Sequence, residues 1–142
     1  MIVLDTNVVS EPMRLDADAK VLAWLDAQEA ETLFLTATSL SELLVGVATL
    51  PEGKRKKGLD TKLGQLIATL FGARVLPFDA SCAVAYAGIV GRARAAGRAI
   101  SVADGQIASI AAVHGFAVAT RDGAPFKAAG VPVIDPWDGL QR

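Results

Sequence analysis

The sequence is poor in the residues on which disulfide-rich, zinc-binding and histidine-dependent proteins rely. Its 142 residues include one cysteine, Cys82, and one histidine, His114. One cysteine excludes an intrachain disulfide, and the two residues together are too few for the usual zinc-ligand sets. A ribonuclease that uses two histidines as general acid and general base is excluded by the same count.

Long apolar runs and an excess of one charge are also missing. No segment approaches about 18 uninterrupted apolar residues, so we expect no membrane-spanning helix. The first residues carry no basic lead, and we expect a cytoplasmic protein without a signal peptide. The formal net charge is -1, so binding of nucleic acid would require a local basic patch.

Short apolar runs alternate along the chain with longer stretches that are typical of helices. The runs do not alternate polar and apolar residues, which is typical of strands that are buried on both faces. The five expected strands are Ile2–Leu4, Leu33–Ala37, Arg74–Phe78, Phe116–Thr120 and Val131–Ile134. The five expected helices are Ala17–Gln28, Leu40–Leu50, Lys56–Phe71, Ser81–Ala96 and Val102–His114.

This order of strands and helices predicts an α/β domain with right-handed crossover connections. We expect one domain over residues 1–142, with a central, mostly parallel five-stranded sheet that helices flank on both faces. The sequence contains no internal repeat, low-complexity segment or linker that would indicate a second domain.

Four acidic residues stand out by their position relative to these elements. Asp5 ends the first expected strand, and Asp122 follows the fourth. Glu42 and Asp104 lie in the first turns of expected helices, although no obvious strand precedes the helix of Asp104. Because ligands bind at the carboxyl edge of a parallel sheet, we expect the four acids to lie together there.

Helical spacing places Glu42 and Asp104 on faces that look buried. Each shares a stripe with small or apolar residues: Val45, Gly46 and Thr49 for Glu42, and Ile107, Ala108 and Ala111 for Asp104. Converging carboxylates repel one another, and a bound divalent cation removes that repulsion. Oxygen ligands favour Mg²⁺ or Mn²⁺, and the chemistry most in need of such a site is phosphodiester hydrolysis.

Each acid also has a purely structural interpretation. Two of them lie three residues after a serine, the spacing of a helix capping box: Glu42 after Ser39 and Asp104 after Ser101. Asp5 could cap a helix or a turn, and Asp122 could belong to a simple turn. Spacing alone leaves the metal site and these local roles equally open.

Four motifs follow one another in register along the chain. They are MIVLDTN at residues 1–7, SEL at residues 41–43 ahead of Gly46, ADGQIA at residues 103–108 and ATRD at residues 119–122. Together with the closing Pro136–Trp137, they resemble PIN-domain proteins, in particular toxins of the VapBC type and their FitB-like branch. The resemblance covers essentially the whole chain.

The resemblance implies a metal-dependent endoribonuclease, the toxin of a type II toxin–antitoxin system, with Mg²⁺ or Mn²⁺ in an acidic site. It implies that Asp5 and Asp104 bind metal directly, and that Glu42 and Asp122 complete the site or act through water. Polar residues would support them: Thr6, Asn7 and Thr120. Many relatives carry another acid a few residues further on, whereas this chain has only Asp122 there.

The resemblance also implies partners. These are an RNA substrate, a second copy of the chain in a homodimer, and a VapB- or FitA-like antitoxin, with operator DNA bound only through the antitoxin. One alternative is a catalytically inactive PIN-fold module that acts only through such an antitoxin–DNA complex. A phosphatase with an aspartyl nucleophile is disfavoured, because Asn7 stands where such enzymes commonly place a second aspartate.

The most polar segment, Pro51–Lys62, contains a run of four basic residues. They are Lys54, Arg55, Lys56 and Lys57. We interpret the run as a rim that guides RNA phosphates towards the acids, with an ordinary solvated surface as the alternative. The segment is expected to join two helices as an exposed, partly helical excursion.

Overall fold

In a computed structural model, which describes residues 1–139, five strands form one sheet in the order β3-β2-β1-β4-β5. Every neighbouring pair is parallel. The strands are β1 Ile2–Leu4, β2 Leu33–Thr36, β3 Val75–Leu76, β4 Ala117–Ala119 and β5 Val133–Ile134. The α/β class and the five-stranded parallel sheet that the sequence predicts are therefore confirmed.

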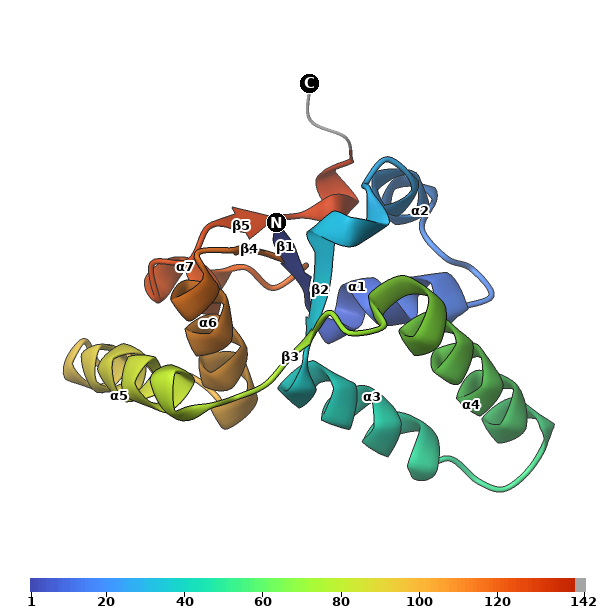
Figure 1. The fold of residues 1–142 in the computed structure, drawn as a ribbon, viewed down its shortest axis with the longest axis horizontal. Coiled ribbons are helices and arrows are strands. Elements are labelled where there is room, and N and C mark those ends of the chain that lie inside the picture. The colour runs from blue at the N-terminus through green and yellow to red at the C-terminus, as the bar shows by residue number, and fades with distance from the viewer. Residues whose placement is uncertain (140–142) are drawn as a thin grey trace.

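Helices cover the two faces of the sheet in two groups (Figure 1). One group comprises α1 Thr6–Ser10, α2 Ala19–Asp26, α3 Ala37–Ala48 and α4 Lys54–Leu66, which continues into the π-turn η3 Ile67–Phe71. The other comprises α5 Ala80–Ala95, α6 Val102–His114 and α7 Ala124–Ala128. The 3-10 turns are η1 Glu11–Met13, η2 Ala30–Thr32 and η4 Pro136–Asp138. No helix in residues 1–139 is both long enough and apolar enough to cross a membrane.

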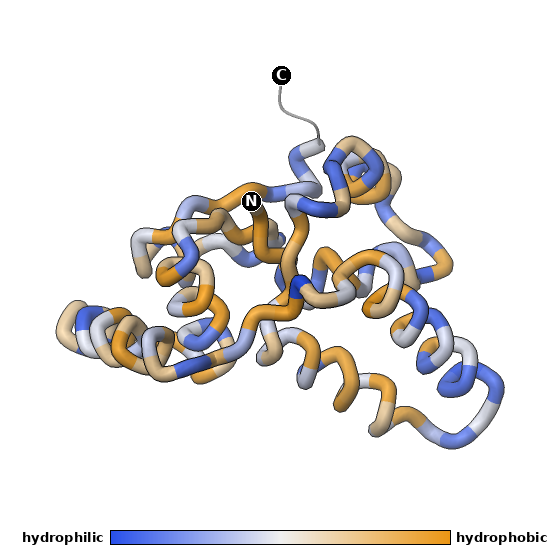
Figure 2. Tube along the Cα trace, viewed as in Figure 1, coloured by the Kyte–Doolittle hydropathy of each residue, from blue (hydrophilic) through white to orange (hydrophobic). Residues whose placement is uncertain are grey.

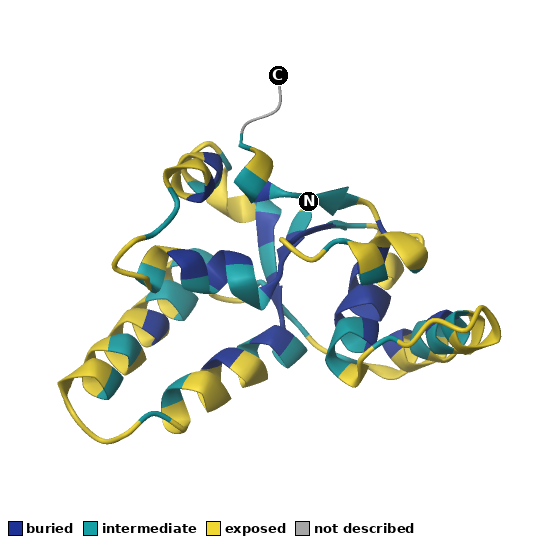
Figure 3. Cartoon of the chain, turned by 180° about the vertical axis from the view of Figure 1, so that it is seen from behind, coloured by how far each residue is buried: buried dark blue, intermediate teal, exposed yellow. Residues whose placement is uncertain are grey.

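Consecutive strand residues point into two separate cores, one on each face. Val3 and Val118 pack with the second group of helices, whereas their neighbours Leu4 and Ala119 pack with the first. This alternation explains the continuous apolar runs, because both faces of each central strand are buried. Figure 2 shows the apolar strands and the hydrophilic α4, and Figure 3 shows burial concentrated on the strands.

The helix after β2 begins three residues earlier than the sequence indicates. Its N-cap is Thr36, whose hydroxyl accepts a hydrogen bond from the backbone N–H of Ser39 at 3.0 Å. The capping-box interpretation of Ser39 and Glu42 is therefore wrong, and Glu42 lies in the second turn rather than the first.

The short helices α1 and α7 were not expected, because five residues are too few to show a helical period.

A glycine allows α5 and α6 to pack closely. A Cβ added to Gly105 on α6 would lie 2.8 Å from Cε2 of Tyr86 on α5. The ring of Tyr86 meets Phe78 edge to face, with centroids 5.8 Å apart, so it has a neighbour that resists its movement. Gly105 follows Asp104 directly, so the contact lies beside one of the four acids that stand out in the sequence.

We expect Gly105→Ala to lower the free energy of unfolding by about 1–3 kcal/mol, because the added methyl group overpacks this contact. The matched control is Gly91→Ala on α5, where an added Cβ has no neighbour within 4 Å. That substitution should raise the free energy of unfolding by about 0.5–1 kcal/mol, since it removes backbone freedom from the unfolded chain. Urea unfolding measures both, and equal effects of the two substitutions would contradict the packing argument.

Candidate functional site

The strand order of the sheet reverses beside β1. The chain moves outwards from β1 to β2 and β3, then returns to place β4 on the other side of β1. In open parallel sheets, such a reversal leaves a crevice at the carboxyl ends of the two neighbouring strands, where ligands bind. Asp5 follows β1 directly, and Thr120 and Asp122 follow β4, so these residues lie at that crevice.

The Asp5 carboxylate is fixed at both oxygens. Oδ1 accepts the backbone N–H of Thr6 at 2.8 Å and caps α1, and Oδ2 accepts the hydroxyl of Thr120 at 2.8 Å. Only 6% of Asp5 is exposed. The structural interpretation of Asp5 as a helix cap is therefore right for one oxygen, but it leaves the bond to Thr120 across the sheet unexplained.

Thr120 joins three elements through one hydroxyl group. It is fully buried, donates to Asp5, and accepts the backbone N–H of Asp122 at 3.1 Å and the Nδ2 amide of Asn7 at 3.4 Å. The remaining amide oxygen of Asn7 is buried and has no hydrogen-bond partner among the described residues. A buried oxygen without a donor, two residues after Asp5, is a ready acceptor for a cation or water.

The two helical acids differ in their surroundings. Asp104 is half-buried on a stripe whose other members, Ile107, Ala108 and Ala111, are buried as the sequence predicts. Its backbone N–H is capped by the Ser101 hydroxyl at 3.1 Å, so this half of the capping box forms. Glu42 is exposed, as are Val45, Gly46 and Thr49, so the expectation that its face is buried is wrong.

Burial and neighbouring carboxylates raise the pKa values of Asp5 and Glu42. The pKa of Asp5 is raised chiefly by burial, and the charges of Asp104 and Asp122 add to this, while the bonds from Thr120 and Thr6 oppose it. The pKa of Glu42 is raised by partial burial and then by the charges of Asp5 and Asp104. The structure thus gathers acids from four separate segments into one neighbourhood, where like charges disfavour full ionisation.

The donor set suits a hard divalent cation in chemical type. It consists of carboxylate oxygens and the unpartnered amide oxygen of Asn7, which are ligands that Mg²⁺ and Mn²⁺ prefer. Within residues 1–139, no group of three or more His, Cys, Asp or Glu side chains is drawn together closely enough to hold an ion. The acids are therefore close enough for their charges to interact, but they are not arranged as a closed set of metal ligands.

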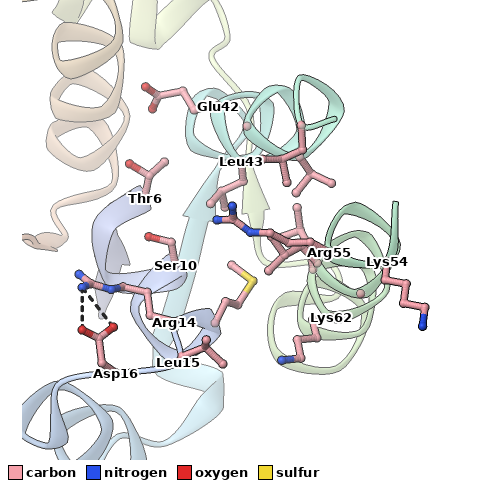
Figure 4. Close-up of a pocket in the computed structure, with 17 residues that line it drawn as sticks. Thr6, Ser10, Arg14, Leu15, Asp16, Glu42, Leu43, Lys54, Arg55 and Lys62 are labelled. Carbon is pink, nitrogen blue, oxygen red and sulfur yellow. Dashed lines mark hydrogen bonds and ion pairs between the residues drawn. The ribbon is translucent and has the colours of Figure 1, made fainter. Parts of the chain in front are cut away.

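A groove of about 810 Å³ opens beside this cluster, between α1, η1, α3 and α4. We call it the α1–α3–α4 groove. Thr6, which follows Asp5, and Glu42 line the same part of it in Figure 4. Two further cations, Arg14 and Lys62, line the groove. The sequence did not single out either of them. Arg14 could not be foreseen, because it follows the unexpected elements α1 and η1.

The structure divides the run of four basic residues, which forms the first turn of α4. Lys54 and Arg55 line the groove. Lys56 instead pairs with the Glu52 carboxylate at 2.7 Å and donates to the Ala48 carbonyl at 3.1 Å. Lys57 is exposed and is not part of the groove.

One aromatic contact fixes the segment after β4. The guanidinium carbon of Arg121 lies 5.0 Å from the ring centroid of Trp137 in η4, a cation–π distance. Arg121 stands between Thr120 and Asp122, so this contact helps to hold both polar residues at the crevice. The sequence pointed to Trp137 only through the closing Pro-Trp pair.

Comparison with known proteins gives consistent matches over the chain. Residues 2–131 match the family described as PIN domain. Plasmid stability protein StbB of Pseudomonas syringae pv. tomato is 50% identical, with 97% of this chain and 99% of the relative covered. VapC ribonuclease Y4jK of Sinorhizobium fredii is 49% identical, with 97% and 99% covered. Toxin FitB of Neisseria gonorrhoeae is 47% identical, with 96% and 99% covered.

Solved structures agree with these matches. In the structure of FitAB bound to the IR36 DNA fragment, one chain is similar to this one with a TM-score of 0.93 and 45% identity. That alignment covers 100% of this chain and 99% of the other.

The raised pKa of Asp5 predicts how stability depends on pH in metal-free buffer. Since the folded protein binds the Asp5 proton more tightly than the unfolded chain, stability falls as pH rises from the ordinary value of 3.8 through the raised pKa. Asn cannot ionise, so we expect Asp5→Asn to flatten this fall and to melt at a higher temperature than wild type near neutral pH in EDTA.

Thermal unfolding in EDTA from about pH 4 to about pH 8 measures the effect. The control is Asp60→Asn, which removes an exposed carboxylate on α4 outside the cluster. Adding Mn²⁺ should stabilise wild type and leave Asp5→Asn little changed. Parallel pH profiles for wild type and Asp5→Asn would contradict the prediction, because they would mean that folding does not raise the pKa of Asp5.

Proposed function

Because this chain belongs to the PIN domain family, we propose that it is a metal-dependent endoribonuclease and the toxin of a type II toxin–antitoxin pair. The observation that carries the proposal is that acids from separate segments act on one another: the charges of Asp104 and Asp122 reach Asp5, and those of Asp5 and Asp104 reach Glu42. A relative that is 49% identical over nearly its whole length is named a VapC ribonuclease, which supports RNA as the substrate.

In this proposal, Asp5 and Asp104 hold Mg²⁺ or Mn²⁺, and Glu42 and Asp122 complete the site directly or through water. A divalent ion bound there supplies positive charge for the phosphate and lowers the pKa of water. The ion would also offset the repulsion that neighbouring acids exert on Asp5 and Glu42. The buried amide oxygen of Asn7 is available to accept a water molecule at the same place.

The chain's own residues divide the remaining tasks. Thr6 and Thr120 hold both oxygens of Asp5, so its orientation does not depend on the ligand. Glu42 is exposed, with a pKa raised above its ordinary value, and is therefore suited to accept a proton from the attacking water. The basic lining of the adjacent groove supplies the local attraction for RNA that a net charge of -1 does not give.

The comparison with relatives also supports a proposal about the partners that this chain binds. The FitAB structure is a complex on a DNA fragment, and its FitB-like chain aligns with essentially all of this one. We propose that this chain likewise forms a homodimer in the cytoplasm and binds a VapB- or FitA-like antitoxin, which blocks the acidic site. Operator DNA would be bound only through that antitoxin.

The antitoxin proposal has a direct test. The protein encoded beside this chain should co-purify with it and suppress its metal-dependent cleavage of RNA, with inhibition complete near one antitoxin per toxin. An unrelated antitoxin serves as the control. If the toxin–antitoxin complex is stable but cuts RNA as well as the free toxin does, the antitoxin binds without inhibiting. That result would contradict the proposal that the antitoxin blocks the acidic site.

The ribonuclease proposal predicts that Asp104→Asn lowers Mn²⁺-dependent cleavage of single-stranded RNA by at least about 10- to 100-fold. The same variant should bind Mn²⁺ more weakly in calorimetry, because a charged ligand has become a neutral one. Asp60→Asn, which changes an exposed acid outside the cluster, should retain both properties. The melting temperature of each variant checks that it is folded.

The same experiment separates the alternative function. An inactive PIN-fold module that acts only through an antitoxin–DNA complex would bind the antitoxin but cut no RNA in any metal. Folded wild-type protein that neither binds Mn²⁺ nor cleaves RNA would therefore overturn the ribonuclease proposal in favour of that module.

A further inference from the structure

The α1–α3–α4 groove continues directly from the acid cluster. Glu42 belongs to both, and Thr6, which lines the groove, donates its backbone N–H to Asp5. If an endonuclease cuts a strand at the acids, the strand must extend away from them, and this groove of about 810 Å³ offers a continuous path. Its floor and walls are otherwise largely aliphatic, with side chains such as Leu43, Val47 and Leu63.

Arg55 is the cation that reaches into this groove. Figure 4 shows its side chain extending from α4 across the cavity towards Leu43 and Ser10, whereas Lys54 points away. Among the described residues, Arg55 forms no ion pair. Its planar guanidinium group therefore has its donors free for a bidentate contact with an anion, and phosphate has the matching geometry.

The other arginine of the groove is already balanced by acids. Arg14 lies 3.6 Å from the buried carboxylate of Glu11 and 3.3 Å from the exposed carboxylate of Asp16. Its charge is therefore largely neutralised within the protein. This contrast leaves Arg55 as the arginine with uncompensated charge facing the groove.

We propose that Arg55 binds a phosphate of single-stranded RNA in the α1–α3–α4 groove, close to the phosphate that is cut. The proposal rests on the ribonuclease function proposed above. A polyanion is favoured because the inward-pointing charge is positive and unpaired, and because the acid cluster alone would repel RNA. The contact positions the strand by its backbone and so carries little base preference.

The test compares Arg55→Gln with Lys57→Gln, which removes the same charge from the same turn of α4 outside the groove. A fluorescently labelled single-stranded RNA is titrated in EDTA, so that binding is measured without cleavage. We expect Arg55→Gln to weaken binding about tenfold, since a charge-assisted contact is lost. The slope of log K against log salt should become shallower by about 0.7, the value for one phosphate contact.

Lys57→Gln should weaken binding about twofold or less and leave the salt slope near that of wild type. Arg55→Lys should fall between wild type and Arg55→Gln, because it keeps the charge and loses the planar fork. In cleavage with Mn²⁺, Arg55→Gln should raise KM and leave kcat nearly unchanged, since the contact does not involve the reacting atoms. Unchanged melting temperatures exclude a folding effect.

Equal losses for Arg55→Gln and Lys57→Gln would overturn the proposal, because they would mean a diffuse charge effect. Unchanged RNA binding in Arg55→Gln would also overturn it and leave the groove to a protein partner. These outcomes differ from failure of the ribonuclease function. If the ribonuclease function fails, wild-type protein cuts no RNA. If only the Arg55 proposal fails, wild-type protein cuts RNA and Arg55→Gln has the same KM.

Discussion

The bond between Asp5 and Thr120 is the constraint on which the candidate site depends. It joins the end of β1 to the end of β4, and the same hydroxyl group also accepts hydrogen bonds from Asn7 and from the backbone of Asp122. Burying a carboxylate is costly, and two hydrogen bonds offset part of that cost. The remaining repulsion from neighbouring acids is the feature that a bound cation would use.

Much of the fold could be predicted from the sequence because its signals are local. Apolar runs mark each of the five strands, and the helix Val102–His114 has the bounds that the sequence predicts, since Ser101 caps it and Gly115 ends it in a left-handed conformation. The helices α1 and α7 are too short for a period. The start of α3 depends on Thr36, which looks like a strand residue and is also the helix cap.

The candidate site was predictable to the extent that topology determines it. Acids that follow parallel strands must lie at one edge of the sheet, and in the structure the charges of Asp104 and Asp122 act on Asp5, while those of Asp5 and Asp104 act on Glu42. The groove was not predictable, because its basic lining depends on how α4 packs against α3 and on the turn that carries Arg14. The sequence predicted that all four basic residues of the run form one rim, but Lys56 and Lys57 do not line the groove. Neighbouring side chains on a helix point in different directions, so adjacency in the sequence did not reveal this.

The pairing of β1 with β4 has a consequence for the order of protein synthesis. Thr120 is synthesised 115 residues after its partner Asp5. A nascent chain that has not yet reached β4 has neither the neighbouring strand nor the hydroxyl group that orients Asp5. The candidate site is therefore assembled only once β4 has left the ribosome and paired with β1.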